Sequence, residues 1–403
     1  MATITKDELR KIPREQRQML PRQREATINS VNAEERKVTL SFASEEPCPD
    51  FWGDPEILRC NDQAADISRF TAGVMPVLFN HNRDAVIGRP TRICFEETYG
   101  EDSEDIATKT LAMPFNTNSV AVSQNVTQPE TITGNRNPVQ PILGNIDNTG
   151  TIAVPLDLTA FGYWLKAMFG NPTTASAGTP EGYYNHVYKL GEDMPSFTME
   201  KAFPGIGVYS KSNGCVISQF SLTVGGDGEL VANLEVMGAK ETIGETAMSS
   251  APVSVPLLRV NNFQAALSIG GTAVALATEA TIEINFGVDG DTYVIGGQGY
   301  RKAACPGIAT VSGTLTMFFK DDTYIAMAEN ATETKLEFTF TSGNNKLSIL
   351  LPEVQFARTS PGIDGPAGIQ VELSYSAYYN DATEGTSVQV TLTNQTASYA
   401  QSE

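Results

Sequence analysis

Two histidines, His81 and His186, are the side chains best suited to act as a general base near neutral pH. A serine hydrolase would hold such a base within hydrogen-bond reach of a hydroxyl nucleophile. The candidate hydroxyls before residue 95 belong to Ser41, Ser44, Ser68 and Thr71. His186 lies in the aromatic stretch YYNHVY (183–188) without a second imidazole nearby. We therefore expect His186 to serve in packing or in an inter-subunit contact rather than in catalysis or metal binding.

The cysteines do not form a metal-binding pattern. They are five in number and widely spaced, without a CxxC pair: Cys48, Cys60, Cys94, Cys215 and Cys305. Zinc sites draw their ligands mainly from cysteine and histidine, and only two histidines exist here. We expect free thiols, no bound metal and no cofactor.

The glycine-rich and aspartate-rich stretches also lack the motifs of phosphate-binding and calcium-binding loops. The stretches at 225–228 and 296–299 lack a GxxxxGK[ST] motif and a GxGxxG motif leading into a helix, so they predict turns between strands. Asp289-Gly290-Asp291 lacks the longer acidic run of a calcium-binding loop.

The negative charge is unevenly distributed. Residues 1–95 hold 14 basic and 14 acidic side chains, so the net charge of −19 lies entirely in residues 96–403. An acidic body grips duplex DNA poorly, because affinity for phosphates comes mainly from Lys and Arg. Such a body suits a surface that DNA must pass without sticking. It also fits solubility through self-repulsion, and charge alone does not separate the two.

Alternating polar and apolar residues predict a mainly β fold, which would position the histidines, cysteines and acidic residues described above. The clearest hairpins are 215–238, around a Gly-rich turn, and 336–351, around Gly343-Asn344-Asn345. Further strands are predicted at 369–379 and 387–394. Two segments, 158–170 and 321–330, have the spacing of short helices that cover a sheet.

The pattern repeats along the chain. The strand 119–126 corresponds to 279–288, and Gly150-Thr151-Ile152 corresponds to Gly313-Thr314-Leu315. In each copy a helix, a strand and a long hairpin follow in the same order. We therefore predict an internal duplication.

The beginning of the chain differs from the rest. Residues 1–24 predict a charged arm with prolines at 13 and 21, and short strands are expected at 37–43, 77–79 and 85–88. The acidic stretch 96–105 is expected to be a linker. Residues 1–26 contain no apolar core of a secretory signal, and the apolar runs are far shorter than the roughly 18–20 residues of a membrane span. We expect synthesis and assembly in a cytoplasm, without membrane contact.

Residues 96–403 resemble the tail tube proteins of tailed bacteriophages through several short segments that follow one another in the same order. The likeness is carried by GTIAVP (150–155), FGYWLKAMFG (161–170), YNHVYKLG (184–191), PSFTMEK (195–201), NGCV (213–216) and VMG (236–238). The resemblance implies a structural subunit of a siphovirus-like tail that assembles into stacked rings for DNA ejection. Two β-domains per chain would let three chains imitate a six-fold ring, although a hexameric ring is the alternative.

Residues 25–95 are similar to the first half of phage prohead proteases. The similarity runs through REATI (24–28), RKVTLSFASEEP (36–47), DISRF (66–70) and PVLFNHNRD (76–84) to Ile87-Gly88. In that family a histidine at the position of His81 is catalytic, and a serine nucleophile follows on a later strand. Here the chain turns to tube-like sequence before such a segment, so we expect no enzyme. His81 would be catalytic only if this fragment were active.

Together these observations predict a mainly β protein: a duplicated tail-tube β-sandwich or barrel with short covering helices, plus a small N-terminal α/β or β-rich domain. The expected divisions are 1–24, 25–95, 96–258 (first repeat) and 259–403 (second repeat). Expected partners are further copies of the chain, tape measure, tail terminator and baseplate or tip proteins, with genomic DNA passing through without specific binding. The location would be the virion tail.

The segment from Asn116 to Gln140 is rich in Asn, Gln and Thr. We expect it to form a loop that inserts between subunits. Inter-subunit contacts are predicted for Asn116, Gln124, Asn125, Asn135 and Arg136. The alternatives are a processing protein related to prohead proteases, and a head decoration or cell-surface β-sandwich protein.

Overall fold

The structure is a computed structural model. It describes residues 90–400 except 193, 204, 364, 366 and 367, together with the backbone of short strands between residues 27 and 88. The chain divides into two units, Met1–Met75 and Pro76–Glu403. The expected charged arm at 1–24 and His81 lie outside the described residues.

Short antiparallel pairs make up the described part of residues 27–88. β1 (Thr27–Asn32) pairs with β2 (Lys37–Ser41), and β3 (Cys48–Pro49) pairs with β4 (Pro55–Glu56). In the second unit, β5 (Val77–Leu78) pairs with β6 (Val86–Gly88). The strands expected at 37–43, 77–79 and 85–88 are therefore present.

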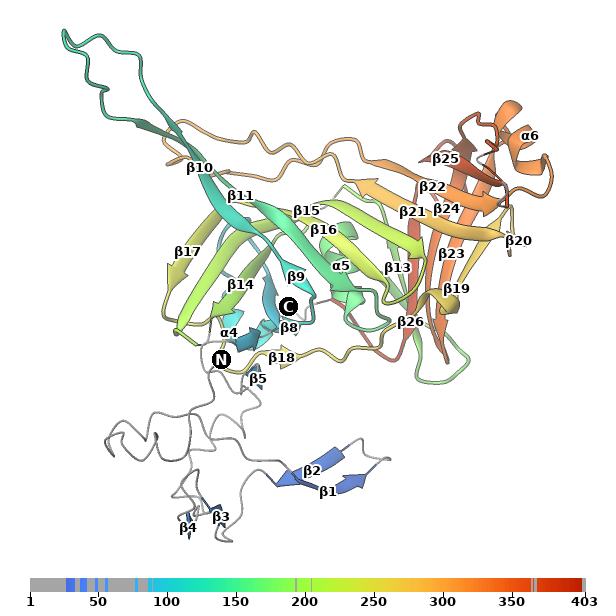
Figure 1. Ribbon diagram of the computed structural model, residues 1–403, viewed down its shortest axis with the longest axis horizontal. Helices are drawn as coiled ribbons and strands as arrows, with labels where there is room; N and C mark the ends of the chain where they lie inside the picture. Colours follow the sequence, from blue (N-terminus) through green and yellow to red (C-terminus); the bar gives the residue numbers. More distant parts are fainter. Residues whose placement is uncertain are drawn as a thin grey trace, which may run out of the picture. The chain divides into compact units, whose positions relative to one another are not determined.

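The remainder is mainly β, as predicted, with a few short helices (Figure 1). Its first half contains β7 (Thr91–Phe95), α4 (Ile106–Lys109), β8 (Leu111–Met113), β9 (Thr117–Asn118), β10 (Ala121–Thr127), β11 (Ile142–Pro155), α5 (Phe161–Phe169), β12 (Thr173–Ser176), β13 (Tyr184–Lys189), β14 (Phe197–Phe203), β15 (Val208–Gly225), β16 (Val231–Gly238), β17 (Lys240–Gly244) and β18 (Val253–Ser254).

Its second half contains the 3-10 helix η2 (Asn262–Gln264), β19 (Ala265–Ile269), β20 (Thr272–Ala273), β21 (Ala277–Asn285), β22 (Thr310–Phe318), α6 (Thr323–Glu329), β23 (Thr334–Ser342), β24 (Asn345–Phe356), β25 (Gln370–Tyr378) and β26 (Gln389–Asn394). Both predicted hairpins, β15–β16 and β23–β24, are confirmed, as are the two covering helices α5 and α6.

The two halves share one order of strand pairing. In the first half the antiparallel order is β10–β11–β16–β15–β14–β7. In the second half it is β21–β22–β25–β24–β23–β19. A helix follows the second strand along the chain of each series, α5 after β11 and α6 after β22. The domain boundaries at 258 and 259 stay predictions.

Two glycines mark equivalent positions in the halves. A Cβ on Gly150 would lie 2.5 Å from the Cα of Val120, and a Cβ on Gly313 would lie 2.0 Å from the carbonyl oxygen of Thr281. Beside them the same hydrogen bond occurs twice, because the Ser119 and Thr281 hydroxyls accept from the backbone N–H of Thr151 (2.9 Å) and Thr314 (2.8 Å). Both backbones approach too closely for any side chain, which supports the equivalence of Gly150 and Gly313.

Helix α5 packs against β13 and β15. Asp157 accepts hydrogen bonds from the backbone N–H of Thr159 (2.6 Å) and Ala160 (2.5 Å), just before the helix begins. Gly170, with φ of 83°, ends it. Trp164 is buried and packs edge-on against Phe197 of β14, with ring centroids 6.0 Å apart. Burial of such large apolar side chains stabilises the fold by roughly 1.5–3 kcal/mol each.

Two pairings join the halves. The end of β15 pairs with β21 over Gln219–Gly225 and Glu279–Asn285. β26 lies between β13 of the first half and β24 of the second, and it pairs with both. The main sheet is therefore continuous from one half to the other.

The expectation of a linker at 96–105 was wrong. The Glu96 carboxylate accepts hydrogen bonds from the hydroxyls of Ser196 (2.8 Å) and Thr198 (2.7 Å) and from the backbone N–H of Gly214 (2.9 Å). An acidic composition suggested a solvated connection, but Glu96 supplies acceptors for three polar groups of the sheet. β7, assigned above to the first 95 residues, pairs with β14 within this sheet.

Candidate assembly surface

A long hairpin projects from the first half. β10 and the first part of β11 pair antiparallel from Ala121↔Thr149 to Thr127↔Ile142, and the chain between them continues outward (Figure 1). Residues 121–128 are exposed throughout, and so are residues 130–138. A hairpin alone is only marginally stable in water. We call residues 119–147 the arm.

The arm carries four of the five predicted contact residues. Gln124 donates to the Gly144 carbonyl across the hairpin (2.9 Å), and Asn125 occupies the position where the register shifts. Asn135 accepts from the backbone N–H of Asn137 at the tip (2.8 Å), and Arg136 is exposed there. Asn116 lies at the base instead, where its amide donates to Glu229 (3.0 Å). Their role in inter-subunit contacts stays a prediction.

Hydrophobic side chains of the arm were missed from the sequence. The exposed ones are Val122 (38%), Val126 (55%), Ile132 (95%), Ile142 (61%) and Leu143 (64%). The stretch was classified by its Asn, Gln and Thr content, although these apolar residues at intervals were the available signal. Exposed apolar residues grouped on one projecting element indicate a contact with another protein surface.

A second projecting segment, residues 286–309 between β21 and β22, lies along the base of the arm (Figure 1). We call it the second loop. The Ile146 N–H donates to the Gly299 carbonyl (2.9 Å), and Arg301 forms an ion pair with Asp147. The Arg301 guanidinium also donates to the carbonyls of Gly290 (2.7 Å) and Gly238 (3.2 Å). Arg301 therefore ties the second loop to the arm and to the end of β16.

Tyr293 completes this contact. Its hydroxyl donates to the Asp147 carboxylate (2.7 Å), and the Arg301 guanidinium lies 5.4 Å from its ring centroid. Burial and the hydrogen bond to Asp147 raise the pKa of Tyr293 to about 12. The phenol therefore stays protonated and donates over the physiological pH range. The turn predicted at 296–299 is the tip of this loop, where Gly296 and Gly299 have φ near 80°.

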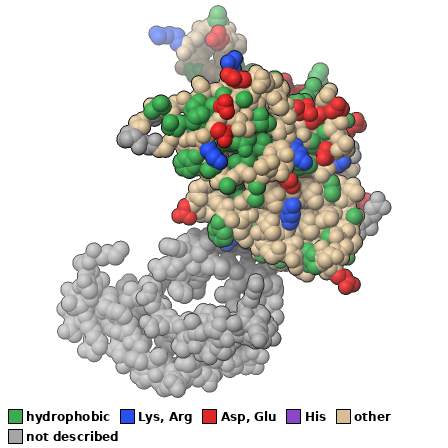
Figure 2. Space-filling model, turned by 90° about the vertical axis from the view of Figure 1, so that its right-hand side faces the viewer, with side chains coloured by type: hydrophobic (Ala, Val, Ile, Leu, Met, Phe, Trp, Pro, Cys, Tyr) green, Lys and Arg blue, Asp and Glu red, His purple; other side chains and the backbone are tan. Residues whose placement is uncertain are grey.

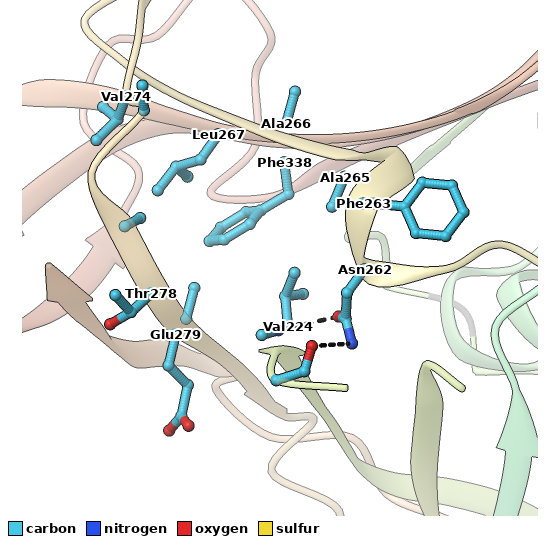
Figure 3. A pocket seen from close by; sticks show the side chains of 15 residues that line it. Val224, Asn262, Phe263, Ala265, Ala266, Leu267, Val274, Thr278, Glu279 and Phe338 are labelled. Atoms are coloured by element: carbon cyan, nitrogen blue, oxygen red, sulfur yellow. Dashed lines mark hydrogen bonds between the residues drawn. The ribbon is translucent and has the colours of Figure 1, made fainter. Parts of the chain in front are cut away.

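A groove of about 470 Å³ borders the β15–β21 junction (Figure 3). Val224 of β15 and Thr278 of β21 line one side, and Leu267 and Phe338 from β19 and β23 line the other. Asn262 secures the end of β15, because its side chain accepts from Gly225 N–H (3.0 Å) and donates to the Gly226 carbonyl (3.3 Å).

A smaller groove of about 280 Å³ lies between β20, β22 and α6. Its lining includes Leu276, Phe318 and Tyr324, and the first two are 38% and 46% exposed. Figure 2, which faces the side of the molecule where α6 lies, shows hydrophobic side chains grouped among acidic and basic ones. This face therefore carries an exposed apolar patch.

His186 is a buried packing residue. Its Nε2 donates to the Thr396 carbonyl (2.9 Å), so its Nδ1 accepts from the Thr174 hydroxyl (2.9 Å). Its ring stands edge-on to Tyr399, with centroids 4.7 Å apart. Burial lowers the pKa of His186, which keeps the ring neutral. Of the two roles expected for it, packing within the chain is confirmed.

Thiols and acidic groups do not gather in the part of the chain that the structure describes. Cys94 and Cys215 are buried, and burial raises the pKa of Cys215. Cys305 is exposed on the second loop. Among described residues no three His, Cys, Asp or Glu side chains are placed to hold a metal ion. No helix within the described ranges has the length and apolar character needed to cross a bilayer.

Comparison with known proteins gives one family. A family model described as "Phage tail tube protein" matches residues 91–377, which is more than two thirds of the chain. The match begins with β7 and includes the arm, the second loop and both covering helices. No curated protein sequence matches the chain. The likeness of residues 25–95 to prohead proteases stays a prediction.

Proposed function

Because the chain belongs to the phage tail tube protein family, we propose that its copies assemble into stacked rings forming the DNA channel of a siphovirus-type tail. The family places it in the virion tail as a structural protein. We further propose that it has no catalytic role and that assembly takes place in the host cytoplasm.

The arm carries this proposal. It extends from the first half with its apolar side chains exposed, among them Ile132 at 95%. Removing such side chains from water releases roughly 25 cal/mol per Å² of apolar surface. A groove on a copy in the next ring would supply that burial, so the arm would join one ring to another.

The charge distribution supports a conduit. The excess of acidic residues lies wholly in residues 96–403, which hold all but the first five residues of the family match at 91–377. Acidic groups facing the lumen would repel the phosphates of passing DNA. We propose that DNA passes without specific binding, and that the ends of the tube contact the tape measure, tail terminator and baseplate or tip proteins.

Electron microscopy of the purified chain tests the proposal. We expect stacked rings with a central hole. A chain that stays monomeric at high concentration would contradict it.

A shortened arm tests the role of the hairpin. Thr127 and Ile142 are paired, so residues 128–141 can be replaced by an Asn-Gly turn. We expect single rings that no longer stack. Ile132→Ser should weaken stacking at least several-fold, whereas the neighbouring Thr133→Ser should leave it unchanged. Normal tubes from the shortened chain would show that the arm does not join rings.

A further inference from the structure

The two equivalent strands β10 and β21 differ in whether their outer edge is paired with another strand. β21 pairs with β22 on one edge and with the end of β15 on the other. Among the described strands β10 pairs with β11 alone. An exposed edge presents unpaired N–H and C=O groups to another chain. The junction that β21 makes inside the chain is therefore missing at β10.

The shared glycine position gives the residue correspondence. Thr149 and Ser312 each precede the equivalent glycine, and their cross-strand partners are Ala121 and Glu283. Continuing outward, Ser123 of β10 corresponds to Asn285 of β21. Inside the chain Glu283 and Asn285 face Ser221 and Gln219 of β15. The free edge of β10 at Ala121–Ser123 should accept an equivalent strand.

The equivalent of β15 is shorter in the second half. Val236 faces Gly150 and pairs with Ile217 of β15, and Tyr375 faces Gly313 and pairs with Phe356 of β24. β15 continues for eight residues beyond Ile217, whereas β24 ends at Phe356. The residues that correspond to the continuation of β15 are thus those after Phe356.

These residues, Ala357–Ser360, follow β24 directly and could continue it as a strand. The Ala357 N–H already donates to the Ser374 carbonyl (2.8 Å), and three of the four residues are exposed. Arg358 forms an exposed ion pair with Glu329 (2.9 Å), which contributes little. Pro361 has no N–H and would end the extension.

We propose that, in the ring of the proposed function, Ala357–Ser360 of one copy forms a strand against Ala121–Ser123 of a second copy. This contact repeats between chains the β15–β21 junction found within each chain. Lys201 donates to the carbonyl of Val120 and so occupies the preceding position of the edge, which sets Ala121 as the first free residue. The inference rests on the proposed function and specifies which two strand edges meet between neighbouring copies.

A paired-cysteine variant tests the contact. The strand β15 has a register shift between Ile217 and Gln219, so Gln219 faces Glu235; in the second half Ala357 faces the equivalent Ser374. Ala357 therefore corresponds to Gln219 and Ser123 to Asn285, which face each other in the internal junction. Opposed residues of antiparallel strands lie about 4.5–5.5 Å apart, within reach of a disulfide. In a Cys305→Ser background, assembled Ser123→Cys/Ala357→Cys chains should form disulfide-linked dimers and larger species upon mild oxidation. Each single variant and Ser123→Cys/Thr383→Cys should form none.

Hydrogen exchange on the unmodified chain gives a second readout. Backbone amides of 357–360 that enter a sheet should exchange at least tenfold more slowly in rings than in the monomer. The turn at 226–228 should change less. Rings without disulfides and without this protection would overturn the inference and leave the proposed function intact. Absence of rings under all conditions would instead contradict the proposed function.

Discussion

At the scale of single residues, a buried ion pair fixes β7 to the sheet. The Arg92 guanidinium lies 2.6 Å from the Glu200 carboxylate, and the side chains are 5% and 0% exposed. The other Glu200 oxygen accepts from the backbone N–H of Met248 (2.5 Å). Both oxygens of the Glu200 carboxylate therefore have a partner inside the protein. Removing this carboxylate would leave the buried Arg92 guanidinium without a counter-ion.

Glu200→Ala is expected to lower the free energy of unfolding by about 3–5 kcal/mol, because Arg92 would stay buried without its counter-ion. Urea unfolding followed by fluorescence measures the change. Glu329→Ala removes an exposed pair with Arg358 and should cost less than about 1 kcal/mol. Equal effects of the two substitutions would refute this account.

Asp157 should make stability depend on pH. Burial raises its pKa to about 7, although backbone N–H groups at Thr159 and Ala160 oppose the shift. In the unfolded chain the pKa is about 4, so the stabilising contribution is full below about pH 4 and is lost as the pH rises through 7.

The difference in unfolding free energy between the parent chain and Asp157→Asn should therefore fall by up to about 4 kcal/mol between pH 4 and 8. Urea unfolding of both proteins across this range is the measurement. A difference that stays constant with pH would show that Asp157 does not titrate in this window.

At the scale of elements, the arm and the second loop form one projecting structure. Arg301 contributes hydrogen bonds to both Gly290 and Gly238 as well as the ion pair with Asp147. It is only 8% exposed, so these bonds are shielded from water. Arg301 therefore supplies several of the contacts that dock the second loop, together with Tyr293 and the Ile146–Gly299 hydrogen bond.

Arg301→Ala is expected to release the second loop. Backbone amides near 299–302 should exchange hydrogen at least tenfold faster, as measured by mass spectrometry, while β22 and β25 keep their protection. Lys302→Ala removes the same charge from an exposed neighbour and serves as the control. Unchanged exchange in Arg301→Ala would mean that other contacts hold the loop.

Much of this level was predictable from sequence. Alternating patterns gave the hairpins β15–β16 and β23–β24, and apolar spacing gave α5 and α6, because these signals are local. The docking of the second loop was not predictable, since Arg301 and Asp147 lie 154 residues apart and carry no pattern. Glu96 was misread for the same reason, because its hydrogen-bond partners are more than 90 residues away.

At the scale of the whole molecule, the chain consists of two separately compact units, and the family match lies entirely in the second. The pairing order repeated in its two halves accounts for most of the strands after residue 90. Sequence patterns gave the β class and the repeat, whereas the residues that pair the halves become identifiable only from strand register.

A chain lacking residues 1–75 should fold and assemble. The second unit contains the whole continuous sheet, so we expect its melting temperature to stay within a few degrees of the full chain. Microscopy should show tubes with the same ring spacing. Loss of cooperative unfolding in the shortened chain would show that the second unit depends on the first.

The position of β26 also has a consequence for biosynthesis. It pairs with β13 and β24 but follows both in the chain, so it leaves the ribosome after all the other strands. Until then the edges of β13 and β24 that it covers are open. A nascent chain therefore cannot complete its own sheet while translation is upstream of residue 389.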